Sequence, residues 1–181
     1  MICCPRFVFF QPTVVNSMHR VKNRDDELRL DSIDLNILAA LQENGRIANV
    51  ELADMVHLSP SPCLARVKAL EQQGYISKYV ALLDPKSLGL CVEVFVQVRL
   101  ERQVQSSFSI FEKAVATRPE IMQCHLMTGT ADYLLRVIVP DLESFQKLLT
   151  DFLSNIPGVT NTQSSISLRQ VNSKTALPIP K

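Results

Sequence analysis

The sequence has no tryptophan, no paired cysteine motif and no long apolar run. Its apolar stretches are all shorter than the roughly 20 residues that a membrane-spanning helix needs, so we expect no membrane association. The net charge at pH 7 is only +1, and any signal for nucleic-acid binding must therefore be local. Hydrophobic residues make up 46% of the 181 residues, which excludes global disorder and supports one large domain or two small ones.

The cysteines and histidines do not form a recognisable metal or disulfide pattern. Disulfide frameworks and zinc ribbons need paired spacings, whereas the cysteines are an odd set: Cys3, Cys4, Cys63, Cys91 and Cys124. His125 has no second ligand nearby in the sequence, and His19 and His57 lie in other parts of the chain. We therefore expect no cofactor, no metal and reduced thiols, as in a cytoplasmic protein.

The N-terminal 29 residues differ from the rest of the chain. Residues 1–17 carry one charge, Arg6, and their apolar piece is too short for a signal-peptide core. Met18 opens a polar, charged run, so we interpret Met18 as the natural start. The alternative is that the first residues form a real arm. We assign residues 1–29 to an N-terminal extension that we expect to be disordered.

Residues 30–83 show the pattern of a helix-turn-helix domain. Ile33, Ile37 and Leu41 recur at helical spacing, and Asn44-Gly45 ends that helix. A second helix is predicted from about residue 50 to 56, with Asn49 as its N-cap, and a third from Pro60 to Gln73. Ser59 is suited to cap the third helix, and proline is tolerated in a first turn. Residues 75–83 alternate loosely and predict a short β wing or a connector.

The third helix has a candidate DNA-contacting face. Cys63, Val67 and Leu70 are spaced to be buried, which leaves small, hydroxyl and basic side chains on the other side. Arginine binds guanine edges or phosphate, serine binds base or backbone, and a helix N-terminus attracts phosphate. Alternatively, these residues are solvated charges on a helix. The predicted DNA-binding residues are Ser59, Ser61, Pro62, Arg66 and Lys68.

The second half of the chain changes its period from 3.6 to 2. Residues 91–100 alternate between valine and polar residues, which predicts a strand, and helix, strand, strand, helix and strand follow. The last strand is predicted from about Val159 to Val171. This order is the ferredoxin-like βαββαβ unit. The sequence thus predicts an α+β protein, with a winged helix-turn-helix at 30–83, a linker at 84–90 and a βαββαβ effector-binding and oligomerisation domain at 91–181.

A family resemblance strengthens this interpretation. The stretch LQENGRIANVELADMVHLSPSPCLARVKALEQQGYI (residues 41–76) resembles the helix-turn-helix of the Lrp/AsnC, or feast/famine, transcription regulators. The resemblance continues through YVALLDP (79–85), IMQCHLMTGTADYLLRVIVPD (121–141) and the Ile156-Pro157-Gly158-Val159 stretch. It implies a DNA-binding regulator that dimerises through its sheets, often assembles to octamers, and binds a small amino acid between subunits of neighbouring dimers, near the turn after the second strand.

In this sequence that turn spans Met127 to Tyr133. Amide groups around Gly129, hydroxyl groups and a carboxylate provide donors and acceptors for an amino-acid zwitterion. The family commonly has an acidic residue after this glycine, whereas Thr130 stands here, which removes one candidate partner for an ammonium group. A plain β-turn with a capping aspartate is the alternative. The predicted effector-binding residues are Thr128, Gly129, Thr130, Asp132 and Tyr133.

Together these features predict a sequence-specific transcription regulator rather than an enzyme. We expect it to bind double-stranded DNA as a homodimer or octamer in the cytoplasm, to respond to an amino acid or a related metabolite, and to control amino-acid metabolism genes. One alternative is a nucleoid-architectural protein with little ligand control. Another is an enzyme on the same scaffold, but the C-terminal half offers a single histidine and few clustered bases.

Overall fold

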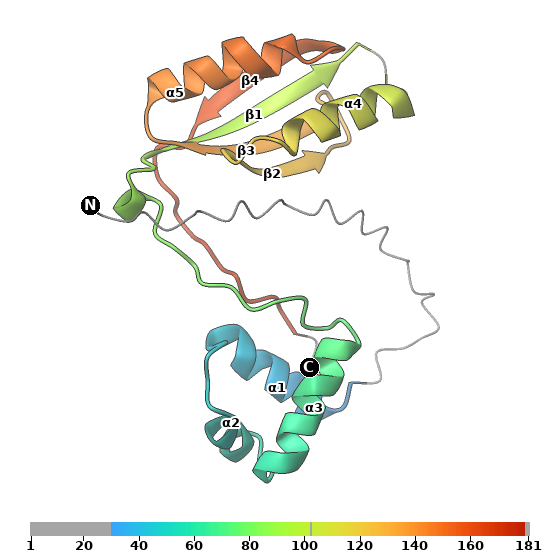
Figure 1. The fold of residues 1–181 in the computed structure, drawn as a ribbon, viewed down its shortest axis with the longest axis vertical. Coiled ribbons are helices and arrows are strands. Elements are labelled where there is room, and N and C mark those ends of the chain that lie inside the picture. Colours follow the sequence, from blue (N-terminus) through green and yellow to red (C-terminus); the bar gives the residue numbers. More distant parts are fainter. Residues whose placement is uncertain (1–29, 102, 180–181) are drawn as a thin grey trace, which may run out of the picture. The chain divides into compact units, whose positions relative to one another are not determined.

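Residues 30–101 and 103–179 are described by the computed structural model, and their contacts divide them into two units (Figure 1). The helical unit comprises residues 30–89 and the chain from Ser167 onward, and the sheet unit comprises Leu90–Ile166. No helix within these two described ranges is long and apolar enough to cross a membrane. The predictions for residues 1–29, including the start at Met18, lie outside the described residues.

The helical unit contains the predicted three helices, α1 (Ser32–Glu43), α2 (Asn49–Met55) and α3 (Pro60–Gln72). Asp31 and Asp34 form a capping box at the start of α1, in which each carboxylate accepts the other residue's backbone N–H. The prediction that Asn49 caps α2 is wrong, because Ala48 is the N-cap and Asn49 is already helical. The three helices enclose one core of Ile37, Leu52, Ala53, Val56, Cys63 and Leu70.

His57 makes the turn between α2 and α3 in an unusual backbone conformation. Its φ is 57°, which makes it the only residue other than glycine with positive φ in the described part of the chain. The turn is held by Leu58, whose N–H donates to the carbonyl of Ala53 at 2.9 Å. A side chain in this left-handed region crowds the following carbonyl group, and glycine avoids that cost. The turn therefore carries a local strain that the packing of α2 on α3 offsets.

The stretch between α3 and residue 85 forms no strand. Gly74 ends α3 with a φ of 81°, and residues 75–84 run on without regular structure, so the β wing predicted at 75–83 is absent and the alternative of a connector holds. A one-turn 3₁₀ helix, η1 (Lys86–Leu88), follows, and the division between the units falls after Gly89. This division lies inside the linker predicted at 84–90.

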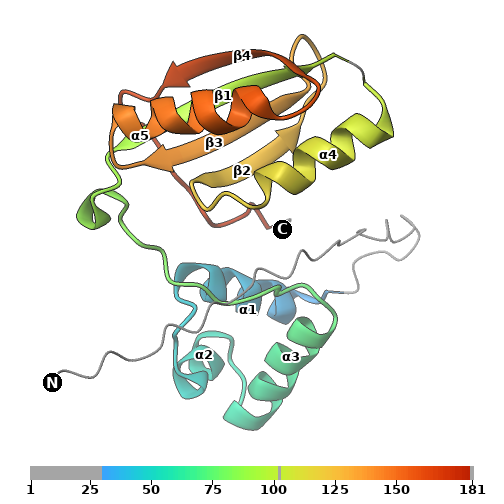
Figure 2. The same ribbon diagram turned by 45° about the horizontal axis from the view of Figure 1, so that its top comes forward.

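The sheet unit has the predicted βαββαβ order. Its strands are β1 (Val92–Leu100), β2 (Ile121–Leu126), β3 (Tyr133–Val139) and β4 (Val159–Ile166), in the spatial order β2-β3-β1-β4 with every neighbouring pair antiparallel. Helix α4 (Gln105–Val115) and helix α5 (Leu142–Lys147) cover the same face of this sheet (Figures 1 and 2). Helical structure continues after α5 as a π segment (Leu148–Phe152) and a 3₁₀ turn (Leu153–Asn155).

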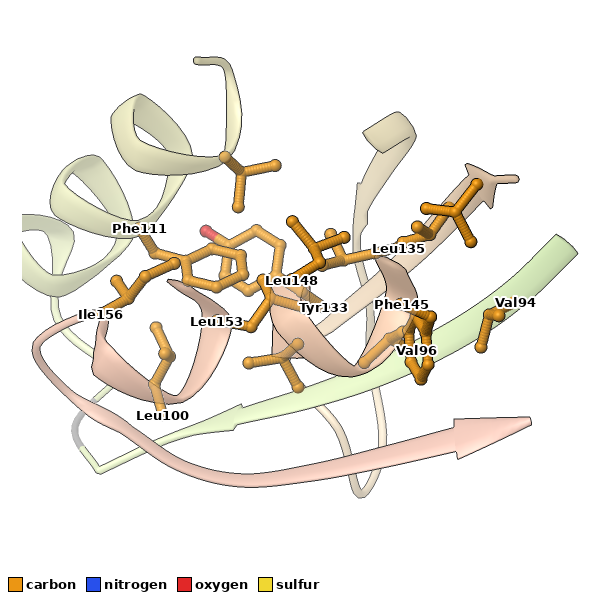
Figure 3. Close-up of a cluster of buried hydrophobic side chains, with 14 residues drawn as sticks. Val94, Val96, Leu100, Phe111, Tyr133, Leu135, Phe145, Leu148, Leu153 and Ile156 are labelled. Carbon is orange, nitrogen blue, oxygen red and sulfur yellow. The ribbon is translucent and has the colours of Figure 1, made fainter. Parts of the chain in front are cut away.

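The core of the sheet unit lies between the sheet and these helices. Val94, Val96 and Val98 of β1 alternate with polar residues and are fully buried, and they pair in register with Val137, Leu135 and Tyr133 of β3. Phe111 of α4 stacks on Tyr133 with ring centroids 4.5 Å apart. Figure 3 shows Phe111 beside Tyr133, whose hydroxyl is the oxygen atom drawn in the cluster. One hydroxyl group therefore reaches the edge of an otherwise apolar core.

The last residues of the chain belong with the helical unit rather than with the sheet. Strand β4 ends at Ile166 and not near Val171 as predicted. Further along, the side chain of Gln42 in α1 and the backbone of Leu177 are joined by two hydrogen bonds, of 2.6 and 3.2 Å. By its contacts the chain from Ser167 onward groups with the helices, whereas the sequence analysis placed it in the domain at 91–181. Gln42 and Leu177 lie 135 positions apart, so their hydrogen bonds leave no periodic pattern by which the sequence could have predicted them.

The conformation of His57 gives a testable prediction for stability. His57→Gly should raise the free energy of unfolding of the helical unit by about 0.5–1 kcal/mol, because the removed left-handed strain exceeds the added entropy of the unfolded chain. Urea denaturation followed by circular dichroism measures the change. His57→Ala keeps a β-carbon and should not stabilise the protein. Equal effects of the two substitutions would mean that the turn is not strained.

Candidate functional site

The exposed face of α3 is the candidate DNA-contacting surface. Cys63 and Leu70 are fully or nearly fully buried, and the side of α3 opposite them is open to solvent. Its outward side chains follow one another at spacings of three or four residues along the helix. They are Ser61, Ala65, Lys68 and Gln72, with Leu64, which is 42% exposed, at the margin. Gln72 was missed in the sequence, although it follows Lys68 by four residues on the same face.

Three predicted DNA-binding residues lie at the start of α3. Ser59 is the N-cap by position, but its side chain makes no capping hydrogen bond, so its hydroxyl is available to a partner. Pro60 and Pro62 occupy the first turn and have no N–H, and the N–H of Cys63 donates to the carbonyl of Ser59 at 3.2 Å. The sequence analysis predicted that free N–H groups at the start of α3 bind phosphate. Of these groups, mainly the N–H of Ser61 remains free.

Arg66 is held by α1 rather than presented on the outward face. Its Nη1 atom donates to Asp31 at 2.7 Å and to Asp34 at 2.8 Å. The N–H of Asp34 and the guanidinium of Arg66 lower the pKa of Asp31, and hydrogen bonds to Asp34 and Asp31 raise the pKa of Arg66. The arginine thus joins α3 to the capping box of α1 and fixes the angle at which α3 is presented. The structure assigns it a positioning role and leaves Lys68 as the exposed cation on the outward face.

Asn49 provides a second link within the helix-turn-helix. Its side-chain amide donates to the carbonyl of Pro60 at 2.8 Å, which ties the start of α2 to the start of α3.

The charged side chains of α2 are acidic and exposed, and they are Glu51 and Asp54. They keep the local charge of one helical unit low. A single copy therefore offers few phosphate contacts.

The predicted effector turn divides into an exposed tip and a buried base. Thr128, Gly129 and Thr130 form the tip, and Gly129 has a φ of 117° with open space around it. Asp132 lies at the base and is only 5% exposed. Its carboxylate accepts the N–H of Leu100 at 2.7 Å and the side-chain amide of Gln103 at 2.6 Å. This aspartate therefore holds the end of β1 against the start of β3, and its contact with an effector stays a prediction.

Tyr133 is also part of the framework, and it is one of the residues that line a cavity of the sheet unit. The side chain is 1% exposed and packs between Phe108 and Phe111. Its hydroxyl donates to Oε1 of Glu112 in α4 at 2.8 Å. Burial, followed by the bond and the charge of Glu112, raises the pKa of Tyr133 well above its ordinary value. Tyr133 stays protonated in the physiological range and directs its O–H toward that carboxylate.

A cavity of about 430 Å³ lies on this side of the sheet unit, between α4 and β2. Glu112, Arg118, Cys124 and Tyr133 are among the residues that line it, together with apolar side chains of both elements. Burial and the charge of Glu112 raise the pKa of Cys124 to about 11, so this thiol stays protonated and is not a nucleophile at neutral pH. Glu112 and Arg118 escaped prediction because no spacing in the sequence links them to Tyr133.

A helix-turn-helix joined to a βαββαβ ligand-binding domain defines a class of transcription regulator. The family model for the Lrp/AsnC ligand binding domain matches residues 93–177, and that for a winged helix-turn-helix DNA-binding domain matches residues 30–77. The leucine-responsive regulatory proteins of Escherichia coli K12 and Klebsiella pneumoniae are each 46% identical over 150 residues, which cover 83% of this chain and 92% of theirs.

Solved structures agree with these sequence relatives. A transcriptional regulator of Neisseria meningitidis, solved as a complex with L-Met, has 42% identity and a TM-score of 0.79, and the match covers 82% of this chain and 96% of that one. AsnC of Escherichia coli has 26% identity and a TM-score of 0.76, with 82% and 99% covered. The chain belongs to the Lrp/AsnC family. It is a transcription regulator with a DNA-binding helix-turn-helix and a ligand-binding domain.

The links of Arg66 predict a stability effect that depends on pH. The pKa of Asp31 is lowered in the folded state, so its interactions stabilise the protein above the ordinary value of 3.8 and are lost as the pH falls through the lowered value. Arg66→Ala should reduce the thermal midpoint of the helical unit at pH 7. The difference from the wild type should shrink below about pH 3.8, in scans by circular dichroism.

Lys68→Ala is the matched control, because Lys68 lies on the same helix and has no ion pair in the part of the chain that the structure describes. This control should leave the thermal midpoint unchanged. An Arg66→Ala protein of unchanged stability that no longer binds DNA would instead return Arg66 to the DNA-contacting surface.

Proposed function

We propose that this regulator binds double-stranded DNA as a homodimer through the outward face of α3, and that a small amino acid modulates this binding. The observation that carries the proposal is the exposed set of Ser61, Lys68 and Gln72 on a helix that Arg66 and Asn49 hold in place. Serine, lysine and glutamine are side chains that contact phosphates and base edges. Ser59 and Pro62 flank this face at the start of the helix.

The amino-acid effector is supported by the relatives. Several are named leucine-responsive regulatory proteins, and the Neisseria meningitidis regulator was solved with L-Met. We infer that this chain takes an effector of the same class, an α-amino acid with an apolar side chain. With such an effector we propose that the chain controls amino-acid metabolism genes and acts in the cytoplasm.

The low charge of one helical unit favours more than one copy on the DNA. Two copies double the phosphate contacts and read two half-sites. The sheet face away from α4 and α5 offers a surface for pairing, where Phe95 of the central strand β1 is 37% exposed. Its partner in register is Arg136, which pairs with Glu93 at 2.6 Å, so apolar and paired polar groups lie side by side. We propose a dimer through this face, and an octamer as its further assembly.

The DNA-contacting face is tested by the salt dependence of binding. Lys68→Ala should weaken binding to a duplex that the wild-type protein selects from a random pool, and it should reduce the slope of log K against log salt by about 1 for each contacting protomer. Fluorescence anisotropy at several salt concentrations measures both. Lys147→Ala, in the sheet unit, is the control. Identical slopes for the wild type and Lys68→Ala would remove Lys68 from the interface.

The pairing face is tested by the mass of the protein in solution. Phe95→Arg places a charge on the proposed interface and should reduce the molar mass by light scattering from at least two chains to one, with a parallel loss of DNA affinity. Leu142→Arg, an equally drastic change at the 57% exposed start of α5, should leave the dimer intact. A dimeric Phe95→Arg protein would show that another surface joins the subunits.

A further inference from the structure

The end of the described chain docks on the helical unit through one glutamine. The side-chain amide of Gln42, in α1, accepts the N–H of Leu177 at 2.6 Å and donates to the carbonyl of the same residue at 3.2 Å. An amide side chain carries an acceptor and a donor next to each other, so Gln42 binds Leu177 as a neighbouring strand would. Leu177 precedes a proline, which favours the extended backbone that presents both groups to one side. We call residues 175–179 the tail.

The tail lines a groove of the helical unit. The groove has a volume of about 720 Å³, and its walls are the end of α1 and the connector at residues 75–82. Thr175, Leu177 and Ile179 line it from the tail. The side chain of Leu177 is 74% exposed, whereas Ala176 and Ile179 are half-buried. The backbone of Leu177, rather than its side chain, therefore attaches the tail.

The connector is fixed to the same helices by Tyr79. Its hydroxyl donates to Oε1 of Glu71 in α3 at 3.0 Å. Its ring lies so close to Gly45 that a β-carbon at that position would be 3.3 Å from Cδ1 of the tyrosine. The end of α1 and the residues just after it therefore hold both segments, the connector at Gly45 and the tail at Gln42.

Each of these segments leads to one of the two points where the chain passes between the helical unit and the sheet unit. The first point follows Gly89, and the second follows Ile166, where β4 ends (Figure 1). Residues 168–174, between the second point and the tail, are exposed. Because the tail is docked, the helical unit is attached at a second place. A body attached at two places has fewer orientations available than a body attached at one.

We propose that the tail is an intramolecular strap, which restricts the helical unit and so lowers the entropic cost of placing two copies of α3 on one DNA. This rests on the proposed function, in which a dimer binds two half-sites. Association costs the freedom that is lost on binding, so units that are restrained beforehand lose less. A single half-site is contacted by one helical unit and requires no fixed distance between two of them. The strap therefore acts only on the complete site.

Proteolysis tests whether Gln42 holds the tail. A protease that cleaves after lysine needs the residues on both sides of the bond to be free and extended, and the tail follows Lys174 at once. Gln42→Leu removes both hydrogen bonds and should speed cleavage after Lys174 about fivefold or more in the full chain, as mass spectrometry measures. Gln146→Leu, at an exposed position of α5, is the matched control and should be cleaved like the wild type. Equal rates for the wild type and Gln42→Leu would overturn the docking.

DNA binding tests whether the docked tail acts as a strap. Fluorescence anisotropy compares two duplexes, one with the site that the wild-type protein selects from a random pool and one with half of that site scrambled. Gln42→Leu should bind the complete site about threefold to tenfold more weakly and the half-scrambled site like the wild type. A chain that ends at Lys174 should behave in the same way, and it keeps the test decisive if Gln42→Leu fails to fold. Gln146→Leu should bind both duplexes like the wild type.

The outcomes separate the strap from the dimer. Unchanged affinity of Gln42→Leu and of the shortened chain for the complete site would overturn the strap. An equal loss on both duplexes would also contradict it, because the tail would then support the fold of the helical unit itself. A wild-type protein that binds the two duplexes equally would overturn the proposed dimer on DNA and with it this role of the tail, whereas faster cleavage of Gln42→Leu would still show the docking.

Discussion

The buried carboxylate of Asp132 is the constraint on which the sheet unit depends. It is the one buried charged residue among the residues that the structure describes, and it accepts hydrogen bonds from Leu100 at the end of β1 and from Gln103 after it. A buried carboxylate that lost these partners would be costly, so the turn before β3 and the end of β1 stay together. Tyr133, the next residue, is thereby set into the core under α4, and its hydroxyl fixes Glu112. The positions of Tyr133 and Glu112 in the cavity wall therefore depend on the buried carboxylate of Asp132.

In the helical unit, Arg66 plays the corresponding part. The two carboxylates that cap the N-terminus of α1 also accept hydrogen bonds from the guanidinium of Arg66. The same charges therefore begin one helix and orient another. The face of α3 that remains free is small and carries one lysine. A surface this small fits the proposed dimer, in which two copies of α3 would share the contacts with DNA.

The elements of the fold were predictable from the sequence because their periodicities are strong. Alternating valines identified β1, and four-residue spacing identified α1. The ends of elements were less predictable, as the absent wing after Tyr75 and the early end of β4 at Ile166 show. Whether an alternating or polar stretch forms a strand depends on a neighbouring strand, and no local pattern reports that neighbour.

Candidate surfaces could be proposed from the sequence, but the partners of their side chains could not. The sequence identified α3 and the β2–β3 turn, yet it could not show that Arg66 faces acids more than 30 positions earlier, or that Asp132 is buried. An arginine on a helix and an aspartate in a turn look the same whether they are exposed or paired. Glu112 and Arg118 join Tyr133 only once α4 lies on the sheet. Side-chain roles that depend on distant partners therefore required the structure.

The most direct test of the roles given to Lys68 and Arg66 is a crystal structure of the full chain bound to its DNA duplex. We expect Lys68 about 3 Å from a phosphate or a base edge, with Arg66 still paired with Asp31 and Asp34. An Arg66 released from both carboxylates and bound to the DNA would contradict its positioning role.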